Sequence, residues 1–114
     1  MSRQIENLAH IAAMMRDRDL GAVERIVAQL NAINADVGQL EAARAARQAD
    51  ASVDMARLTG MDMRWMAELE RRILQLRRRE AVLRVQHEAA LARARKAFGR
   101  ADVTARLAAL KPPV

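Results

Sequence analysis

Residues 61–106 of this chain read MDMRWMAELERRILQLRRREAVLRVQHEAALARARKAFGRADVTAR, with no proline and a single glycine. At steps of three and four residues, the large apolar side chains fall on one stripe, which alanines then continue. A stripe this narrow is typical of a long helix that packs along its length against another helix, from the same chain or from a copy. The stripe consists of Met66, Leu69, Ile73, Leu76 and Leu83, followed by Ala90, Ala94, Ala97 and Ala101.

The first half of the chain carries a second stripe, at residues 23–40, with the three-four spacing of a coiled coil. Folding the chain near residue 56 places Val23 near Ala90 and Leu40 opposite Ile73. We therefore predict an all-α, elongated, antiparallel two-helix coiled-coil hairpin, each arm about 70 Å long at about 1.5 Å per residue. The predicted seam comprises Val23, Ile26, Leu30, Ile33, Val37, Leu40, Met66, Ile73 and Leu83.

The segment RDRDLG at residues 16–21 interrupts the first helix pattern. Before it, the stripe consists of Ile5, Leu8, Ala12 and Met15, and the stripe that resumes at Val23 is displaced by one position. Two interpretations are open, a phase slip within one long helix or a short break near residues 17–21 with Asp19 capping a new start. The single helix is favoured because Gly21 costs only about 1 kcal/mol in a helix interior.

A single helical hairpin domain is expected over residues 1–114. Its first helix should span about 3–48, its turn about 49–62 and its second helix about 63–109, followed by a disordered tail at 110–114. Thr59-Gly60 is the best stop signal in the turn, and Asp62 is the best cap for the second helix. The tail prediction rests on Pro112 and Pro113, because prolines cannot continue a helix.

The charge is unevenly distributed. The net charge is +6, and eighteen arginines stand against two lysines. Residues 1–54 contain six basic and eight acidic residues, a net charge of −2, whereas residues 55–114 contain fourteen basic and six acidic residues, a net charge of +8. A surface of this kind favours acidic partners, which include protein, nucleic acid and anionic lipid.

Several classes of function lack the residues they need. There is no cysteine, and the two histidines have no further ligand at helical spacing, so we expect neither a metal nor a cofactor. No nucleophile, paired carboxylate or glycine-rich phosphate loop is apparent, so we expect no enzyme activity. No window of about 18 residues is free of charge and no signal peptide is recognised, which favours a soluble cytoplasmic protein without membrane insertion.

Two polar residues, Glu80 and His87, occupy seam positions. They either fix the register of the pairing or lie at its edge, where the stripe rotates so that Leu91 and Phe98 take over. We favour the rotation, because Leu91, Ala94 and Phe98 form three-four steps of their own.

Two surfaces are candidates for binding a partner. Met61, Met63, Trp65 and Met66 gather beside the turn, where they either form an adaptable docking surface or shield one another. The arginine-rich run around residues 71–84 either docks on acidic loops or phosphates or forms a solvated face braced by glutamates, and the solvated face is favoured.

The second half of the chain resembles the FliJ/YscO family, small coiled-coil proteins of the flagellar and injectisome type III export apparatus. The features that match are Arg64-Trp65 at the start of the second helix, the seam of Leu69, Ile73 and Leu76, and a charged helix that continues to Leu107. The resemblance implies a hairpin similar to the central stalk of rotary ATPases. Such a stalk enters and promotes the hexameric export ATPase, contacts the export gate and escorts chaperones, at the inner face of the membrane.

Rival interpretations are a homodimeric coiled-coil adaptor, in which each stripe meets its own copy, and a basic nucleic-acid-binding protein. A membrane-surface helix is the weakest, because arginines surround the helix and leave no wide apolar face. The chain is therefore expected to be a monomeric hairpin or a dimer. As partner-binding positions we select Trp65, Leu69, Arg72, Leu76, Arg77, Arg78 and Arg79.

Overall fold

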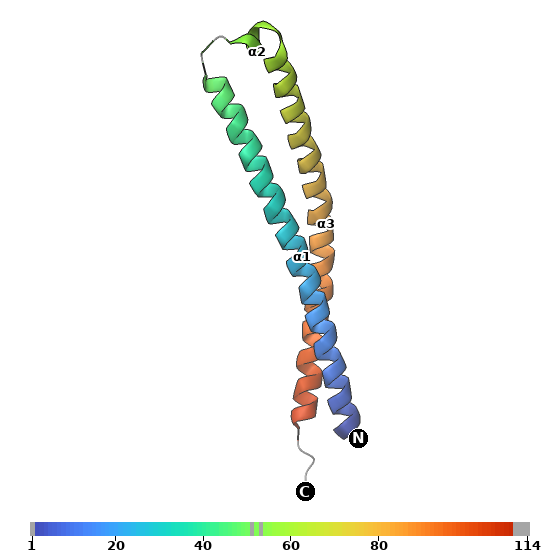
Figure 1. Ribbon diagram of the computed structural model, residues 1–114. Coiled ribbons are helices and arrows are strands. Elements are labelled where there is room, and N and C mark those ends of the chain that lie inside the picture. Colours follow the sequence, from blue (N-terminus) through green and yellow to red (C-terminus); the bar gives the residue numbers. More distant parts are fainter. Residues whose placement is uncertain (1, 51, 53, 111–114) are drawn as a thin grey trace. The chain divides into compact units, whose positions relative to one another are not determined.

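The computed structural model describes residues 2–50, 52 and 54–110. They form three helices, α1 (Ser2–Ala49), α2 (Met55–Leu58) and α3 (Met61–Ala109), and no strand is present in this part of the chain (Figure 1). The predicted all-α helical hairpin is confirmed. Of the tail predicted to be disordered, residues 111–114 lie outside the described residues.

The chain divides into two compact units, and each pairs a segment of α1 with an antiparallel segment of α3 (Figure 1). We call Ala28–Arg84, which includes α2, the turn unit. The remainder, up to Val27 and from Val85 onward, is the terminal unit.

The helix α1 is continuous through residues 16–21, so the break considered there is absent. The expected phase slip is also wrong. Along α1 the buried and half-buried positions follow one another at steps of four and three residues, and this spacing continues unchanged through residues 16–21. Leu8 and Met15, which the sequence pattern assigned to the apolar stripe at the start of the first helix, are exposed. Charged residues occupy two of the seam positions and hide the register from a search for apolar residues. In the first part of α1 these positions are Ile5, Ala9, Ala12, Arg16, Asp19 and Val23.

The core of the turn unit consists of large aliphatic side chains. Leu83 and Val37 are the largest fully buried side chains, and Ile33, Leu69 and Leu76 are also buried. The other seam residues selected in this unit are half-buried, namely Leu30, Leu40, Met66 and Ile73. Removing these side chains from water is the main force that holds the two helices together here.

The core of the terminal unit is built from small side chains. Val23, Ala90 and Ala94 form one cluster, against which Ile26 and Leu91 pack. Val23 and Ala90, which the sequence placed near each other, thus lie in the same cluster. Alanines form the α3 side of this interface, and Ala97 and Ala101 are buried as well. A seam of alanines buries less apolar area per residue than the leucine seam of the turn unit.

The expected rotation of the α3 stripe is wrong. Glu80 is buried, whereas Phe98 is 46% exposed and lies under the guanidinium of Arg16 at 5.8 Å from its ring centroid. Glu80 tolerates burial because Arg77 and Arg84, one turn away on either side, approach its carboxylate to 3.4 and 3.7 Å. The original stripe therefore continues through Glu80 into the alanines.

The turn between α1 and α3 contains the short helix α2. Asp54 caps the N-terminus of α2 by accepting a hydrogen bond from the backbone N–H of Arg57, at 3.1 Å. Gly60 has a φ of 79°, in the left-handed region that favours glycine, so it stops α2 as the Thr59-Gly60 signal indicated. Asp62 does not cap α3, which begins one residue earlier; it lies in the first turn of α3.

Candidate protein-binding surfaces

An ion-pair network joins the two arms at the turn. The guanidinium of Arg47, near the end of α1, binds the carboxylates of Asp50 at 3.2 Å, Asp54 at 3.0 Å and Asp62 of α3. The guanidinium of Arg57 donates hydrogen bonds to the backbone carbonyls of Arg47, at 3.0 Å, and Asp50. Asp50 lies just past the end of α1, and its backbone N–H also donates to the Arg47 carbonyl, at 3.3 Å. Arg57 therefore adds to the hydrogen bonds that satisfy the carbonyls at this end of the helix. The network thereby fixes the path of the chain around the turn.

These contacts shift the pKa values of the groups involved. The hydrogen bond from Arg47, followed by that from the Arg57 backbone, lowers the pKa of Asp54. Bonding to Asp54 and then to Asp62 raises the pKa of Arg47 above its usual range. The pKa of Asp50 is lowered chiefly by the backbone N–H of Ser52, which donates to it at 2.9 Å. Asp50 and Asp54 therefore remain ionised to a lower pH than free aspartate side chains do.

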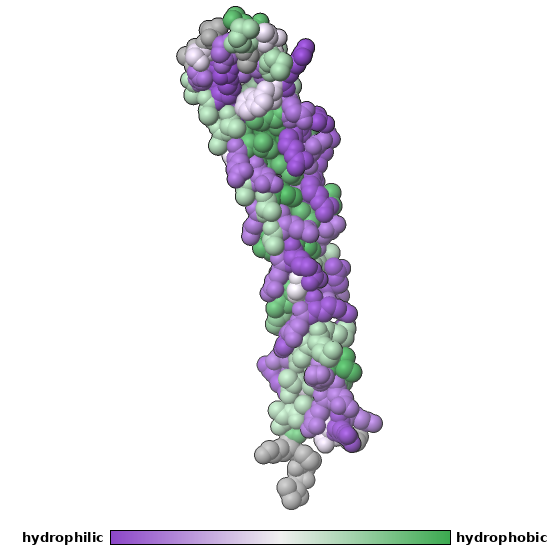
Figure 2. All heavy atoms as spheres, in the orientation of Figure 1, coloured by the Kyte–Doolittle hydropathy of each residue, from purple (hydrophilic) through white to green (hydrophobic). Residues whose placement is uncertain are grey.

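Beside this network lies an exposed apolar surface, the turn cluster, which consists of Met55, Leu58, Met61, Met63 and Trp65. Figure 2 shows apolar residues exposed at the turn, among hydrophilic ones. Met63 is 78% exposed and Trp65 is 44% exposed, so the cluster does not shield itself. Trp65 and Met61 line a shallow depression together with Arg47, Asp54 and Asp62. Exposed methionines and a tryptophan beside charged groups are typical of a protein-binding surface.

The arginines selected on α3 differ in their surroundings. Arg77 forms ion pairs with Glu41 of α1 and with Glu80, both at 3.4 Å, so it braces the hairpin. Arg72, Arg78 and Arg79 are exposed, and none of them takes part in an ion pair within the described part of the chain. The solvated-face interpretation therefore fits Arg77, whereas the other three present free guanidinium groups to a partner.

Helical spacing brings some of these residues onto one face. Trp65, Arg72 and Arg79 are seven residues apart, so they lie on the same side of α3. Leu69 and Leu76, also selected as partner-binding positions, are buried between the helices and offer no surface to a partner in this hairpin. Of the selected set, a partner can thus reach one tryptophan and the exposed arginines.

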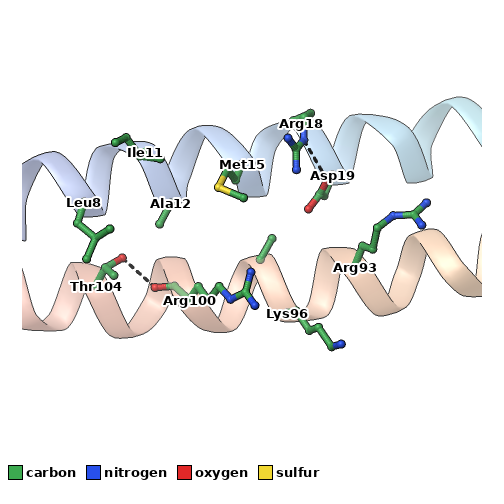
Figure 3. A pocket seen from close by; sticks show the side chains of 11 residues that line it. Leu8, Ile11, Ala12, Met15, Arg18, Asp19, Arg93, Lys96, Arg100 and Thr104 are labelled. Carbon is green, nitrogen blue, oxygen red and sulfur yellow. Dashed lines mark hydrogen bonds and ion pairs between the residues drawn. The ribbon is translucent and has the colours of Figure 1, made fainter.

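Sequence reasoning missed a third surface, which lies in the terminal unit. An open groove of about 400 Å³ runs between α1 and α3, and we call it the terminal groove (Figure 3). Leu8, Ile11 and Met15 supply its apolar wall from α1, and Arg93, Lys96 and Arg100 supply a basic wall from α3. The full lining comprises Leu8, Ile11, Ala12, Met15, Arg18, Asp19, Arg93, Lys96, Ala97, Arg100 and Thr104.

The signal that indicates this groove is the register of α1. Once Arg16 and Asp19 are counted as seam positions, Leu8 and Met15 move off the seam to its flank. Their large apolar side chains are then exposed beside the seam, where they line the groove.

The described residues hold no group of three or more His, Asp or Glu side chains arranged to bind a metal ion. No helix among the residues described here has a stretch that is both long and apolar enough to cross a bilayer.

No protein-family model matches this chain, and neither a curated protein nor a solved structure matches it.

Proposed function

We propose that this chain is a non-enzymatic, protein-binding helical hairpin that acts as the stalk of a flagellar or injectisome type III export apparatus. In this role it engages the hexameric export ATPase, promotes its activity and contacts the export gate or chaperones. It would work at the cytoplasmic face of the membrane and be held there by the export complex rather than by insertion.

One observation carries the proposal, namely that two helices of 48 and 49 residues pair in antiparallel fashion within one chain. This is the architecture that the FliJ/YscO resemblance implies. Neither helix contains a proline, and alanines line part of the seam, so the paired helices within each unit are stiff, as a stalk that transmits or senses a rotation requires.

The exposed surfaces suit such a role. The turn cluster offers apolar contacts, and the free guanidinium groups of Arg72, Arg78 and Arg79 suit the acidic loops of a partner. Each exposed ion pair contributes only about 0–1 kcal/mol, so such contacts break readily, as a moving stalk requires.

The decisive experiment adds the purified chain to the hexameric export ATPase of the same organism and measures ATP hydrolysis. We expect a several-fold stimulation. Replacing the seam residue Leu30 or Leu83 with Asp should abolish it, because a charge in the seam separates the helices. A chain that neither binds nor stimulates the ATPase would contradict the proposal.

A charge-reversal variant and a neutral surface variant of α3 then distinguish a loss of docking from a loss of folding. Arg72→Glu/Arg78→Glu/Arg79→Glu should leave the helicity unchanged by circular dichroism and should reduce the stimulation. Val82→Ser, an exposed position of α3, should leave both unchanged. If the triple variant instead removes a salt-sensitive affinity for duplex DNA, and the ATPase is unaffected throughout, the nucleic-acid interpretation replaces this one.

A further inference from the structure

We propose that the terminal groove binds an acidic amphipathic helix of a partner protein. The inference does not depend on the export function, because it rests on the terminal unit alone. The groove lies between two helices, and a third helix is the element that such a groove accepts in helical bundles.

The apolar wall of the groove is exposed without a covering element. Leu8, Ile11 and Met15 are 54%, 53% and 37% exposed, although they are large aliphatic side chains. They follow one another at steps of three and four residues along α1. This spacing is that of the anchor residues through which one helix holds the apolar face of another.

The opposite wall carries the charge. Arg93, Lys96 and Arg100 of α3 line the groove, and none of these side chains forms an ion pair with another described residue. Figure 3 shows the side chain of Arg93 reaching toward α1 and that of Lys96 extending away from it, into solvent. The remaining charged residues in the lining, Arg18 and Asp19, form an ion pair with each other at 3.2 Å, so their charges cancel. The groove therefore presents a net positive wall to its occupant.

The two walls share one spacing, and this spacing specifies the occupant. Residues 8, 11 and 15 on α1 and residues 93, 96 and 100 on α3 both follow the pattern i, i+3, i+7. A helix laid in the groove would set an apolar stripe against α1 and a neighbouring stripe of Asp or Glu against α3, each at the same spacing. The occupant is thus a helix with an apolar stripe flanked on one side by acidic residues.

A second copy of the chain fits the groove poorly. In a two-fold dimer the same surface meets itself, so Arg93, Lys96 and Arg100 of both chains would gather at one interface. Without counter-charges, this concentration of like charge is unfavourable.

Two synthetic 18-residue peptides test the proposal. Both carry the same leucine stripe at i, i+3 and i+7, and the flanking stripe is Glu in one peptide and Lys in the other. Fluorescence anisotropy with the full chain should show the Glu peptide binding at least tenfold more tightly than the Lys peptide. Its affinity should fall as salt is added, because exposed charges are screened.

Variants of the chain assign the binding to the groove. Arg93→Glu/Lys96→Glu/Arg100→Glu should reverse the preference, so that the Lys peptide binds better. The matched control Arg72→Glu/Arg78→Glu/Arg79→Glu carries the same change in net charge in the turn unit and should keep the preference for the Glu peptide. Ile11→Ser should weaken the binding of both peptides. Val85→Ser, at an exposed position outside the groove lining, should leave their binding unchanged.

Four results would overturn the proposal. Equal affinity for both peptides shows that the groove recognises apolar side chains alone, and failure of both peptides to bind excludes a helix of this kind. A dimer in sedimentation that Ile11→Ser dissociates assigns the groove to a second copy. The chain could instead bind phosphatidylglycerol vesicles and not the Glu peptide. If the Arg93/Lys96/Arg100 triple variant loses this vesicle binding, the groove is assigned to lipid.

Discussion

At the scale of single residues, burial separates apolar side chains that look alike in the sequence. Leu83 is 1% exposed in the seam, whereas Val85, two positions along the same helix, is 71% exposed. Leu83→Ala should lower the free energy of unfolding by about 2–4 kcal/mol, because it removes buried methyl groups and leaves a cavity. Val85→Ala should change it by less than about 0.5 kcal/mol. Urea unfolding followed by circular dichroism measures both values, and equal losses would contradict the assigned register.

The turn network makes a second prediction at this scale. NMR titration of the carboxyl carbon of Asp54 should give a pKa below the ordinary value of 3.8, because Arg47 and the Arg57 backbone bind the charged form. A carboxyl whose pKa is lowered by folding stabilises the fold above its unfolded pKa, and this contribution is lost as the pH falls through the folded pKa. The turn should therefore loosen only in acid.

Arg47→Gln tests the cause of this shift. The variant should return the pKa of Asp54 toward 3.8, because it removes the largest contribution. Arg71→Gln serves as the control, since Arg71 lowers the pKa of Glu68 and does not contact Asp54. An unchanged pKa of Asp54 in the Arg47 variant would mean that the ion pairs at the turn do not form in solution.

Single residues also show how far the sequence could be interpreted. Leu83 and Val37 were selected by spacing alone, because large apolar residues at three-four steps report the seam directly. The pairing of Arg47 with Asp62 was not foreseen, since two charges fifteen residues apart across a turn leave no periodic signal. Leu8 and Met15 were misassigned because Arg16 and Asp19 occupy the true seam positions.

At the scale of elements, replacing each of two glycines with alanine should change the stability of the protein in opposite directions. Gly60 has a positive φ, so Gly60→Ala should destabilise the hairpin by about 1 kcal/mol or more. Gly99 lies inside α3, and a side-chain carbon added there meets nothing within 4 Å. Gly99→Ala should therefore stabilise the protein by about 0.5–1 kcal/mol, because alanine favours the helix. Thermal unfolding measures both, and a shift of the same sign in both variants would contradict the position of the turn.

The elements themselves were predictable to different degrees. The two long helices follow from their helix-forming composition and from the three-four spacing of their large apolar residues. The four-residue helix α2 was missed, because a single turn is too short to show a period. The helix α1 is continuous through residues 16–21, as the low cost of Gly21 indicated, but its register there was missed because Arg16 and Asp19 occupy seam positions.

At the scale of the whole molecule, the fold could be predicted but the partner-binding surfaces only in part. The seam is repetitive, so many residues report it at once. A binding surface depends on which side chains the seam leaves exposed, and an error of one position in α1 conceals the terminal groove. Met61, Met63 and Trp65 of the turn cluster were visible as candidates because they lie close together in the sequence.

Both proposed surfaces require that α1 and α3 pair within a single chain. The chain has no native cysteine, so the double variant Val23→Cys/Ala90→Cys can be oxidised without side reactions. Mass spectrometry at low micromolar concentration should show a monomer that has lost two hydrogens, since both positions belong to one core cluster. A product that consists mainly of disulfide-linked dimers would contradict the intramolecular hairpin and favour the homodimeric coiled coil.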